Sequence, residues 1–288
     1  MANSFVDSAS EFLKKWTDSL ISVAKLAVGS HRQRISPKLR SGKKLIVLGN
    51  GSSLRETIRD YEPILQTHTL LAVNFAAITE EFTRLRPAYY VMVDPVFFDT
   101  DSKNMNVERL HERLNCVDWE MTLFVPFKEL KKSYWLTNEN VTVVGFNFLG
   151  IEGFKGLCNW AFKSGRGMPR PRNVLIPSLM IGLWLGYKEI YITGADHSWT
   201  KTLEVDETNT VVSVQPHFYE ESAEEKRRVE SVYKNVKLYE ILDSFRVAFK
   251  SYFEIKRFAA RESANIYNST PGSFIDAFPR RPLSSIMD

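Results

Sequence analysis

Short apolar runs recur along the chain, and longer segments with apolar residues at helical spacing lie between them. The runs are rich in Val, Ile and Leu, which is typical of strands buried on both faces of a parallel sheet. Strand and helix in alternation predict an α/β fold, with helices on both faces of that sheet. The predicted strands are residues 45–48, 69–73, 88–93, 122–125, 141–144 and 188–193, and the predicted helices are residues 54–65, 76–85, 105–114 and one that starts at Pro177.

Two parts of the chain depart from this alternation. Residues 145–172 contain many glycines and interleaved aromatics, which predicts a long irregular segment that is either functional or a covering for apolar surface. Residues 220–260 keep a helical spacing but change from charged to apolar and aromatic, which predicts two helices or a kinked one. Phe249, Phe253 and Phe258 in this segment are candidates for a subunit interface, and hence for a homo-oligomer.

The N-terminal part, residues 4–28, predicts an amphipathic helix. Three lysines lie beside its apolar face, so the helix is compatible with an anionic membrane surface. Packing on the domain or on another subunit is favoured, because Asp7 and Glu11 dilute the positive charge. A polar linker at residues 30–42 then divides the chain into an N-terminal unit, residues 1–42, and a main domain, residues 43–288. The apolar face consists of Phe5, Phe12, Leu13, Trp16, Leu20, Val23, Ala24 and Ala27.

Polar residues mark the ends of the first three predicted strands. Asn50 follows the first strand, Asn74 the second and Asp94 the third. Because the carboxyl ends of parallel strands share one edge of the sheet, these side chains should converge where such sheets bind ligands. Asn and Asp are also common in turns, but three of them at equivalent places favour a site.

The Gly-Asn-Gly at residues 49–51 breaks the first strand sharply. Ser52 or Ser53 can cap the helix that follows, and Glu56 is placed for a capping box. Such a turn exposes backbone N–H groups where a phosphate can bind. An ordinary strand-to-helix turn is an equal interpretation, because the spacing is neither that of a dinucleotide fingerprint nor that of a P-loop.

Composition sets the broad class. The chain has 288 residues, of which 44% are hydrophobic and 25% charged, and a formal net charge of +4, which is ordinary for a globular protein and gives no indication of nucleic-acid binding. The two cysteines, Cys116 and Cys158, show no metal-site spacing and fit a reducing compartment. We see no membrane-spanning run and no signal peptide, so we expect a cytoplasmic protein that is either free or peripheral on the inner face of the membrane.

Four blocks of the sequence resemble motifs of a known family. They are GNGSSL at residues 49–54, Asn74 with Asp94-Pro95, GYKEIY at residues 186–191 followed by TGAD at 193–196, and a weaker one in IYNS at residues 266–269 with Phe274-Ile275. In these blocks the sequence is similar to the Campylobacter-type bacterial sialyltransferases of glycosyltransferase family 42, and to the related domain of bacterial flagellin-modifying transferases. The resemblance covers roughly residues 43–280 in order.

This resemblance implies a single Rossmann-like domain, a GT-A-like variant, with a lid around residues 200–219. It implies inverting, metal-independent transfer of sialic acid or a related acidic sugar from a CMP-sugar donor to a glycan acceptor, with no further cofactor. Ser198 and residues 173–175 depart from the family pattern near the donor, so another CMP-activated acidic sugar remains open. The residues expected at the nucleotide are Gly49, Asn50, Gly51, Ser52, Asn74, Asp94, Asn173, Gly194, Asp196 and His197.

The resemblance also implies the catalytic groups. His217 would be the general base that takes the acceptor's proton, and Tyr219 would donate a hydrogen bond to the leaving phosphate. The family pattern has a second His where this chain has Glu221, so another register makes that carboxylate the base. His197 is the next candidate.

Two other function classes stay open. Residues 99–101, Asp-Thr-Asp, have the carboxylate spacing of metal-dependent transferases, although a solvated loop is favoured. A Mg²⁺-dependent pyrophosphokinase of the hydroxymethylpterin type would use clustered carboxylates, for which the candidates are Asp94, Asp99, Asp101 and Asp196. A degenerate nucleotide-binding module is the non-enzymatic alternative.

Overall fold

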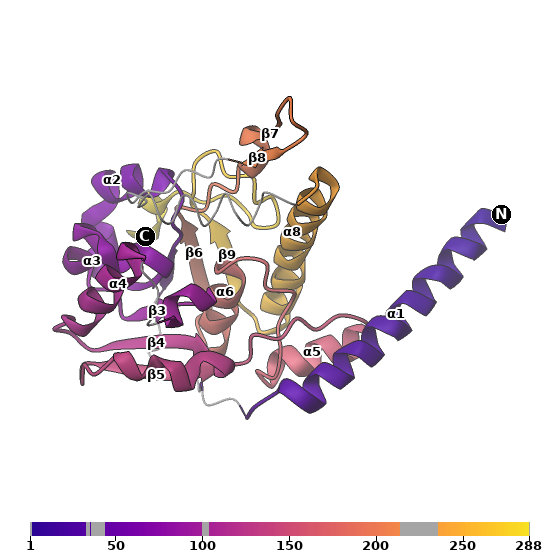
Figure 1. Ribbon diagram of the computed structural model, residues 1–288, viewed down its shortest axis with the longest axis horizontal. Coiled ribbons are helices and arrows are strands. Elements are labelled where there is room, and N and C mark those ends of the chain that lie inside the picture. The colour runs from indigo at the N-terminus through magenta and orange to yellow at the C-terminus, as the bar shows by residue number, and fades with distance from the viewer. Residues whose placement is uncertain (1, 33–34, 36–43, 100–103, 214–235, 288) are drawn as a thin grey trace.

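The protein is described by a computed structural model that covers residues 2–32, 35, 44–99, 104–213 and 236–287 (Figure 1). Seven parallel strands form one twisted sheet in the order β5-β4-β3-β2-β1-β6-β9. All six predicted strands are present, so the α/β class is confirmed. The strands are β1 (Leu45–Leu48), β2 (Thr69–Val73), β3 (Tyr89–Val91), β4 (Met121–Pro126), β5 (Val141–Phe146), β6 (Glu189–Thr193) and β9 (Asn265–Asn268).

Helices cover both faces of the sheet. In β1, Leu45 and Val47 face one buried apolar cluster and Ile46 and Leu48 face the other, as strand alternation requires. Central strands such as β1 and β2 therefore appear in the sequence as unbroken apolar runs, because they are buried on both faces. The helices are α1 (Ala2–Gly29), α2 (Ser53–Thr67), α3 (Glu80–Leu85), α4 (Met105–Asn115), α5 (Lys155–Lys163), α6 (Leu175–Trp184) and α8 (Leu238–Arg261), with 3-10 turns at Asn74–Ile78, Pro95–Phe98, Phe127–Trp135, Trp199–Thr202 and Leu283–Met287.

The structure corrects several predicted elements. The helix expected over residues 76–85 is a 3-10 turn followed by the short α3, and the segment expected to be irregular at residues 145–172 contains α5. Lys237 has an extended backbone and its N–H donates to the Glu240 carboxylate at 2.8 Å, so α8 starts there. One uninterrupted helix over residues 220–260 is thereby excluded, as predicted. A small antiparallel hairpin, β7 (Leu203–Val205) and β8 (Val211–Ser213), was not predicted.

The order of the strands positions the functional site. From β1 the chain builds the sheet outward to β5, then returns through α5 and α6 to place β6 on the other side of β1. A crevice opens at such a reversal, outside the carboxyl ends of the two central strands. The loops after β1 and β6 meet at this point.

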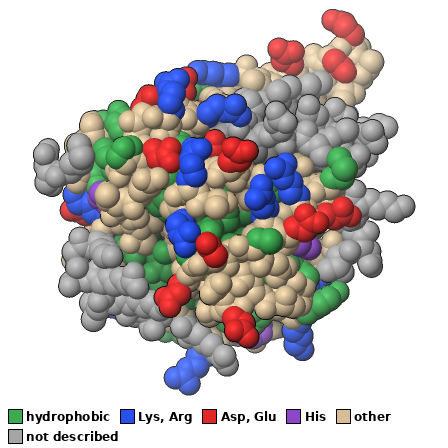
Figure 2. All heavy atoms as spheres, turned by 90° about the vertical axis from the view of Figure 1, so that its left-hand side faces the viewer, with side chains coloured by type: hydrophobic (Ala, Val, Ile, Leu, Met, Phe, Trp, Pro, Cys, Tyr) green, Lys and Arg blue, Asp and Glu red, His purple; other side chains and the backbone are tan. Residues whose placement is uncertain are grey.

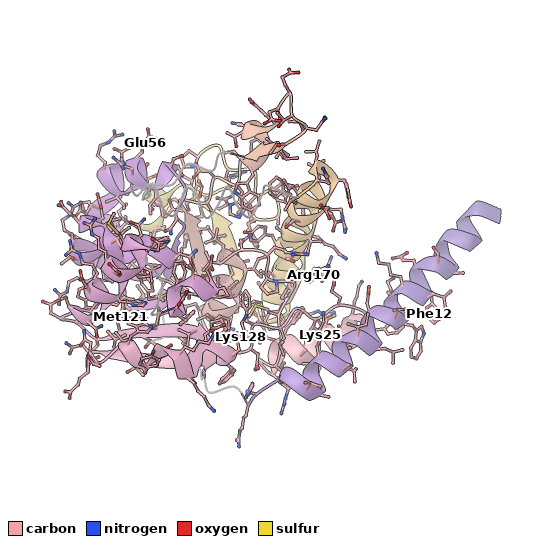
Figure 3. All side chains as sticks on the ribbon, in the orientation of Figure 1. Phe12, Lys25, Glu56, Met121, Lys128 and Arg170 are labelled. Atoms are coloured by element: carbon pink, nitrogen blue, oxygen red, sulfur yellow. The ribbon has the colours of Figure 1, made fainter. Side chains whose placement is uncertain are left out.

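The outer surfaces differ in character. Figure 2 shows the side that carries α2, α3 and α4, where acidic and basic side chains are interspersed. On the opposite side α1 extends beyond the body of the molecule (Figures 1 and 3). Among the described helices none is both long and apolar enough to cross a membrane.

Candidate functional site

A cavity of about 610 Å³ lies at the carboxyl ends of β1, β2, β3 and β6. Its walls bring together nine of the ten residues predicted to contact a nucleotide, from segments far apart in the sequence. The tenth, Gly49, is not part of the lining. The nine are Asn50, Gly51, Ser52, Asn74, Asp94, Asn173, Gly194, Asp196 and His197.

The turns after β1 and β6 are packed backbone against backbone. The N–H of Gly49 donates to Thr193 O and the N–H of Gly51 donates to Gly194 O, both at 2.8 Å. A Cβ on Gly49 would lie 2.3 Å from Gly194 O, so no larger residue fits there without a backbone shift. The two glycines after β1 thus permit a close approach between strands, which is the plainer of the two interpretations of Gly-Asn-Gly.

The amino end of α2 already holds a carboxylate. Asp196 Oδ2 accepts a hydrogen bond from the N–H of Ser53 at 3.4 Å, while Ser52 makes no side-chain cap bond and the expected capping box with Glu56 is not formed. A negative charge at this position is stabilised by the helix dipole and N–H groups. A phosphate at the same place would compete with Asp196 for these N–H groups, so this helix end is a poor site for an anionic ligand.

The polar residues after β1, β2 and β3 hold the rim of the cavity. Asn50 donates through Nδ2 to Val73 O at 3.2 Å, and Asp94 caps the following 3-10 turn by accepting from Val96 N at 3.1 Å. Asn74 has a left-handed backbone with φ of 48°, and its carbonyl accepts from the buried Tyr90 hydroxyl. Each residue therefore makes a turn-stabilising bond and still faces the cavity.

A chain of three side chains crosses the back of the cavity from β6 to α6. His197 Nε2 lies 2.6 Å from the hydroxyl of Tyr252 on α8, and that hydroxyl donates to Asn173 Oδ1 at 3.1 Å. Asn173 Oδ1 also caps α6, accepting from the N–H groups of Leu175 and Ile176 at 3.0 and 3.3 Å. This network links the β6 turn, the α6 start and α8 into one polar unit within a largely apolar core.

Burial fixes the protonation of this network. Loss of solvent lowers the pKa of His197 to about 3, and it raises the pKa of Tyr252 well above its usual range, so both are neutral near pH 7. The Tyr252 proton points to Asn173 Oδ1, which can only accept, so the short contact with His197 requires the imidazole Nε2 to carry the donated proton. His197 is then a neutral imidazole whose Nδ1 makes no hydrogen bond to any described residue.

Buried polar atoms at the cavity that lack partners among the residues described include the donor Nδ2 of Asn173 and the acceptor Oδ1 of Asn74. The Asn173 amide cannot be flipped without losing two backbone N–H bonds, so Nδ2 is truly a donor there. Buried polar groups are normally paired, so these atoms indicate a ligand with a complementary acceptor and donor.

The rest of the lining is apolar and aromatic, with basic groups at its edge. Trp199 lies tilted over the His197 ring with centroids 4.1 Å apart, and Phe148 and Val174 line the same space. Arg172 and Lys201 are the basic residues of the lining. A flat ring can pack among these aromatics while the cationic groups face a charged part of the same ligand.

The C-terminal segment supports the β6 turn from outside the sheet. Thr270 Oγ1 accepts from Ala195 N at 3.1 Å, Ser273 Oγ donates to Ala195 O at 2.6 Å, and Phe274 N donates to Asp196 O at 2.8 Å. Residues 266–275, the weakest block of the sequence comparison, therefore do contact the site. They hold the backbone of the loop that presents Asp196.

Other predicted residues are either outside the described part of the chain or away from the cavity. His217, Tyr219, Glu221, Thr100 and Asp101 lie outside the described residues. Asp99 is exposed and is not part of the cavity lining. Within the described part of the chain, no three His, Cys, Asp or Glu side chains cluster in a way that could hold a metal ion. Of the lid expected at residues 200–219, the described part is a 3-10 turn that lines the cavity through Lys201 and Thr202, followed by the β7–β8 hairpin.

The sequence did not reveal Tyr252, Trp199, Arg172 or Lys201. Tyr252 sits in an aromatic stretch of α8 that has the spacing of an ordinary core helix. Its hydroxyl is the one polar atom that such a pattern does not explain, because a fully buried phenol needs a partner. The sequence can therefore indicate that the Tyr252 hydroxyl has a hydrogen-bond partner, but only the structure shows that the partners are His197 and Asn173.

Comparisons with known proteins leave the family open. No protein-family model and no curated protein matches the chain. A similar solved structure is that of the MAf glycosyltransferase from Magnetospirillum magneticum AMB-1, with 11% sequence identity and a TM-score of 0.48 over 89% of this chain. The match covers 36% of that protein, so the present chain spans little more than a third of its length.

Proposed function

We propose that the chain is a glycosyltransferase that binds a nucleotide-activated sugar in the β1–β6 cavity, with a CMP-activated acidic sugar as donor and a glycan as acceptor. The observation that carries this proposal is that Asn173 and Asn74, which both line one cavity at the sheet's reversal point, keep a buried donor and a buried acceptor without a partner among the described residues. The GNGSSL and GYKEIY sequence blocks support the same function class.

The lining suits such a donor. A cytosine ring presents acceptor and donor atoms on one edge, which the Asn173 amide N–H and the Asn74 amide oxygen would pair with. The phosphate and the sugar carboxylate would lie toward Arg172 and Lys201, because these supply positive charge away from the acidic Asp196.

The transfer itself needs a base and a stabilised leaving group. As the acceptor oxygen bonds to the anomeric carbon, the bond from that carbon to the phosphate oxygen breaks, CMP leaves, and the acceptor proton passes to a base. His217 or Glu221 is the base in this proposal. His197 is a poor base near pH 7, because burial holds its pKa near 3, and it acts as a neutral group that positions Tyr252 and Asn173.

A Mg²⁺-dependent pyrophosphokinase is the second candidate. It is favoured by one observation, that Asp94 and Asp196 both line the cavity. Such an enzyme would bind ATP in a Mg²⁺-dependent manner, whereas the proposed transferase binds CMP without a metal.

Calorimetry with CMP, cytidine and ATP, each with and without Mg²⁺, tests the proposal. Asn173→Asp keeps the oxygen that caps α6 and replaces the unpaired donor by a charged oxygen, so it should weaken CMP and cytidine about tenfold. Loss for cytidine matters most, because cytidine has no phosphate for the new charge to repel.

Asn159→Asp is the matched control, since it makes the same change on α5, away from the cavity. It should keep wild-type affinity for both ligands. Tight ATP binding that requires Mg²⁺, with no CMP binding, would favour the pyrophosphokinase. Wild-type affinity for cytidine in Asn173→Asp would show that the nucleoside does not bind at this amide.

A further inference from the structure

The long N-terminal helix α1 is attached to the domain by its polar side. Ser22 Oγ donates to Glu152 O at 2.8 Å and accepts from Glu152 N at 2.9 Å, and Ser19 Oγ accepts from Phe154 N at 2.9 Å. Gly153 has φ of 114°, and a Cβ there would lie 2.1 Å from Ser19 Oγ. These contacts fix the rotation of the helix about its own axis.

Charged residues of α1 also turn inward. Glu11, Lys14, Lys15 and Asp18 line a groove of about 460 Å³ whose other wall is α8 and the segment around Arg170. In Figure 3 Arg170 lies between α8 and the end of α1 that meets the body. Glu11 is paired with Lys15 at 3.0 Å. The side of α1 toward the domain is therefore the polar one, which is the reverse of an ordinary surface helix.

Most of the apolar side of α1 faces solvent, although the half-exposed rings of Phe12 and Trp16 also contact Phe154 edge to face. Leu13 and Leu20 are each 65% exposed and Val23 is 51% exposed. At 3.6 residues per turn, these apolar positions spread over about half of the helix circumference. In Figure 3 Phe12 lies on the part of α1 beyond the body, and Lys25 near its junction. The further exposed apolar residues are Phe12, Trp16, Ile21 and Val28.

We propose that this apolar side of α1 docks in the plane of an anionic lipid surface. An exposed apolar patch of this extent marks an interaction site. Its described residues include no Asp or Glu. Lys14, which also lines the groove, and Lys25, whose ammonium also donates to Gly150 O at 3.4 Å, lie along one border, as in helices that bind the interface of a membrane. Beyond the carboxyl end of α1, Arg166 donates to Ser30 Oγ at 3.5 Å and lies over the half-exposed ring of Trp160.

The width of the patch favours lipid over a second copy of the chain. A two-stranded coiled coil buries a narrow seam of positions spaced three and four apart and carries charges beside it. Here Leu13, Trp16, Leu20 and Val23 would form that seam, yet Ile21 and Val28 would stay exposed outside it. Phe12 and Trp16 also provide the aromatic side chains that suit the headgroup level.

Vesicle co-sedimentation of the full chain tests this surface. The wild type should bind vesicles of phosphatidylcholine mixed with phosphatidylglycerol more tightly than vesicles of phosphatidylcholine alone, and salt should weaken the binding. Leu13→Ser with Leu20→Ser should weaken it more than about tenfold, because burial of apolar carbons supplies the partitioning. The melting temperature should stay unchanged, since both side chains are exposed.

The matched control is Leu238→Ser with Leu242→Ser, which makes the same change at two exposed leucines of α8. This variant should bind vesicles like the wild type. A Trp16→Phe variant should lose part of the blue shift in tryptophan emission that vesicles cause in the wild type.

Sedimentation equilibrium without lipid tests the alternative, in which the patch binds a second copy of the chain. A dimer that Leu13→Ser with Leu20→Ser dissociates, combined with no vesicle binding, would assign the patch to a second copy and overturn the proposal. Vesicle binding that is equal in the wild type and the α1 variant would overturn it as well, as would a wild type that neither binds vesicles nor associates.

Discussion

At the scale of single residues, His197 makes the stability of the protein depend on pH. Its pKa is lowered from 6.5 to about 3 by burial, so between these values the unfolded chain binds a proton that the folded chain does not. Stability contributed by the neutral buried ring is complete above pH 6.5 and is lost as the pH falls toward 3. The slope is about 1.4 kcal/mol per pH unit.

His197→Gln keeps an amide N–H that can donate to Tyr252 and cannot titrate. The variant should be less stable than the wild type at pH 7, and the difference should shrink by about 2 kcal/mol at pH 5. Urea unfolding at the two pH values measures this. An equal difference at both would mean that the ring is protonated in the folded protein or open to water.

Single residues also differ in whether their place in the site could be predicted from the sequence. Asn50, Asn74 and Asp94 could be predicted because each directly follows a buried strand, and parallel strands bring such positions to one edge. The role of Asp196 as a cap on α2 could not, because it depends on a contact across 143 residues. The partners that the sequence made visible were local, with Ser52 or Ser53 as the cap and Glu56 in a capping box.

At the scale of elements, the glycines after β1 carry a prediction. Gly49→Ala would place its Cβ 2.3 Å from the backbone oxygen of Gly194, so the β1 and β6 turns must separate. We expect a loss of about 1–3 kcal/mol in the free energy of unfolding, as for overpacking elsewhere in a core. Nucleotide binding should weaken with it, because both turns line or flank the cavity.

Gly156→Ala is the control for this change. It lies in α5, where an added Cβ meets nothing within 4 Å, so alanine should stabilise the protein by about 0.5–1 kcal/mol. Chemical denaturation of both variants gives the comparison. A Gly49→Ala protein as stable as the wild type would show that the close packing of the two turns is not required.

The elements that the sequence missed share a physical cause. β9 is four residues long and reads Asn-Ile-Tyr-Asn, which lacks the apolar run of a central strand because it lies at the sheet edge. The turn at Asn74–Ile78 is apolar enough to look helical, but the left-handed backbone of Asn74 and the Tyr90 hydroxyl hold it as a 3-10 turn. Both outcomes are decided by tertiary contacts.

At the scale of the whole molecule, the N-terminal helix α1 lies mostly outside the core, whereas the C-terminal segment is part of it. α1 has an apolar pattern that predicts burial, but its most buried residues are Ser19 and Ser22. Its apolar face was expected to pack on the domain or on another subunit; Phe12 and Trp16 contact Phe154 edge to face, whereas Leu13 and Leu20 are exposed. Periodicity identifies a face without saying what covers it. The sequence of the C-terminal segment has little apolar periodicity, and yet its side chains are buried in the core.

Removing the C-terminal segment should therefore cost much more stability than removing α1. Ile266, Ile275, Phe278, Leu283 and Ile286 are buried, and together such side chains contribute about 10 kcal/mol, which is comparable to the whole stability of a domain. Removing residues 264–288 should therefore abolish cooperative unfolding. It also removes the edge strand β9 beside β6.

Removing residues 1–29 should cost far less. The helix is held by the bonds of Ser19 and Ser22, which are worth about 2 kcal/mol together, and by the partly buried Leu26, while most of its other described large apolar side chains are exposed. The melting temperature should fall by no more than about 5 °C. The nucleotide affinity should be unchanged, because no described side chain of α1 lines the cavity. Calorimetric scans of the two truncated chains decide the matter: a shorter N-terminus that unfolds the protein would mean that α1 belongs to the core, and its apolar side would then need no partner outside the chain.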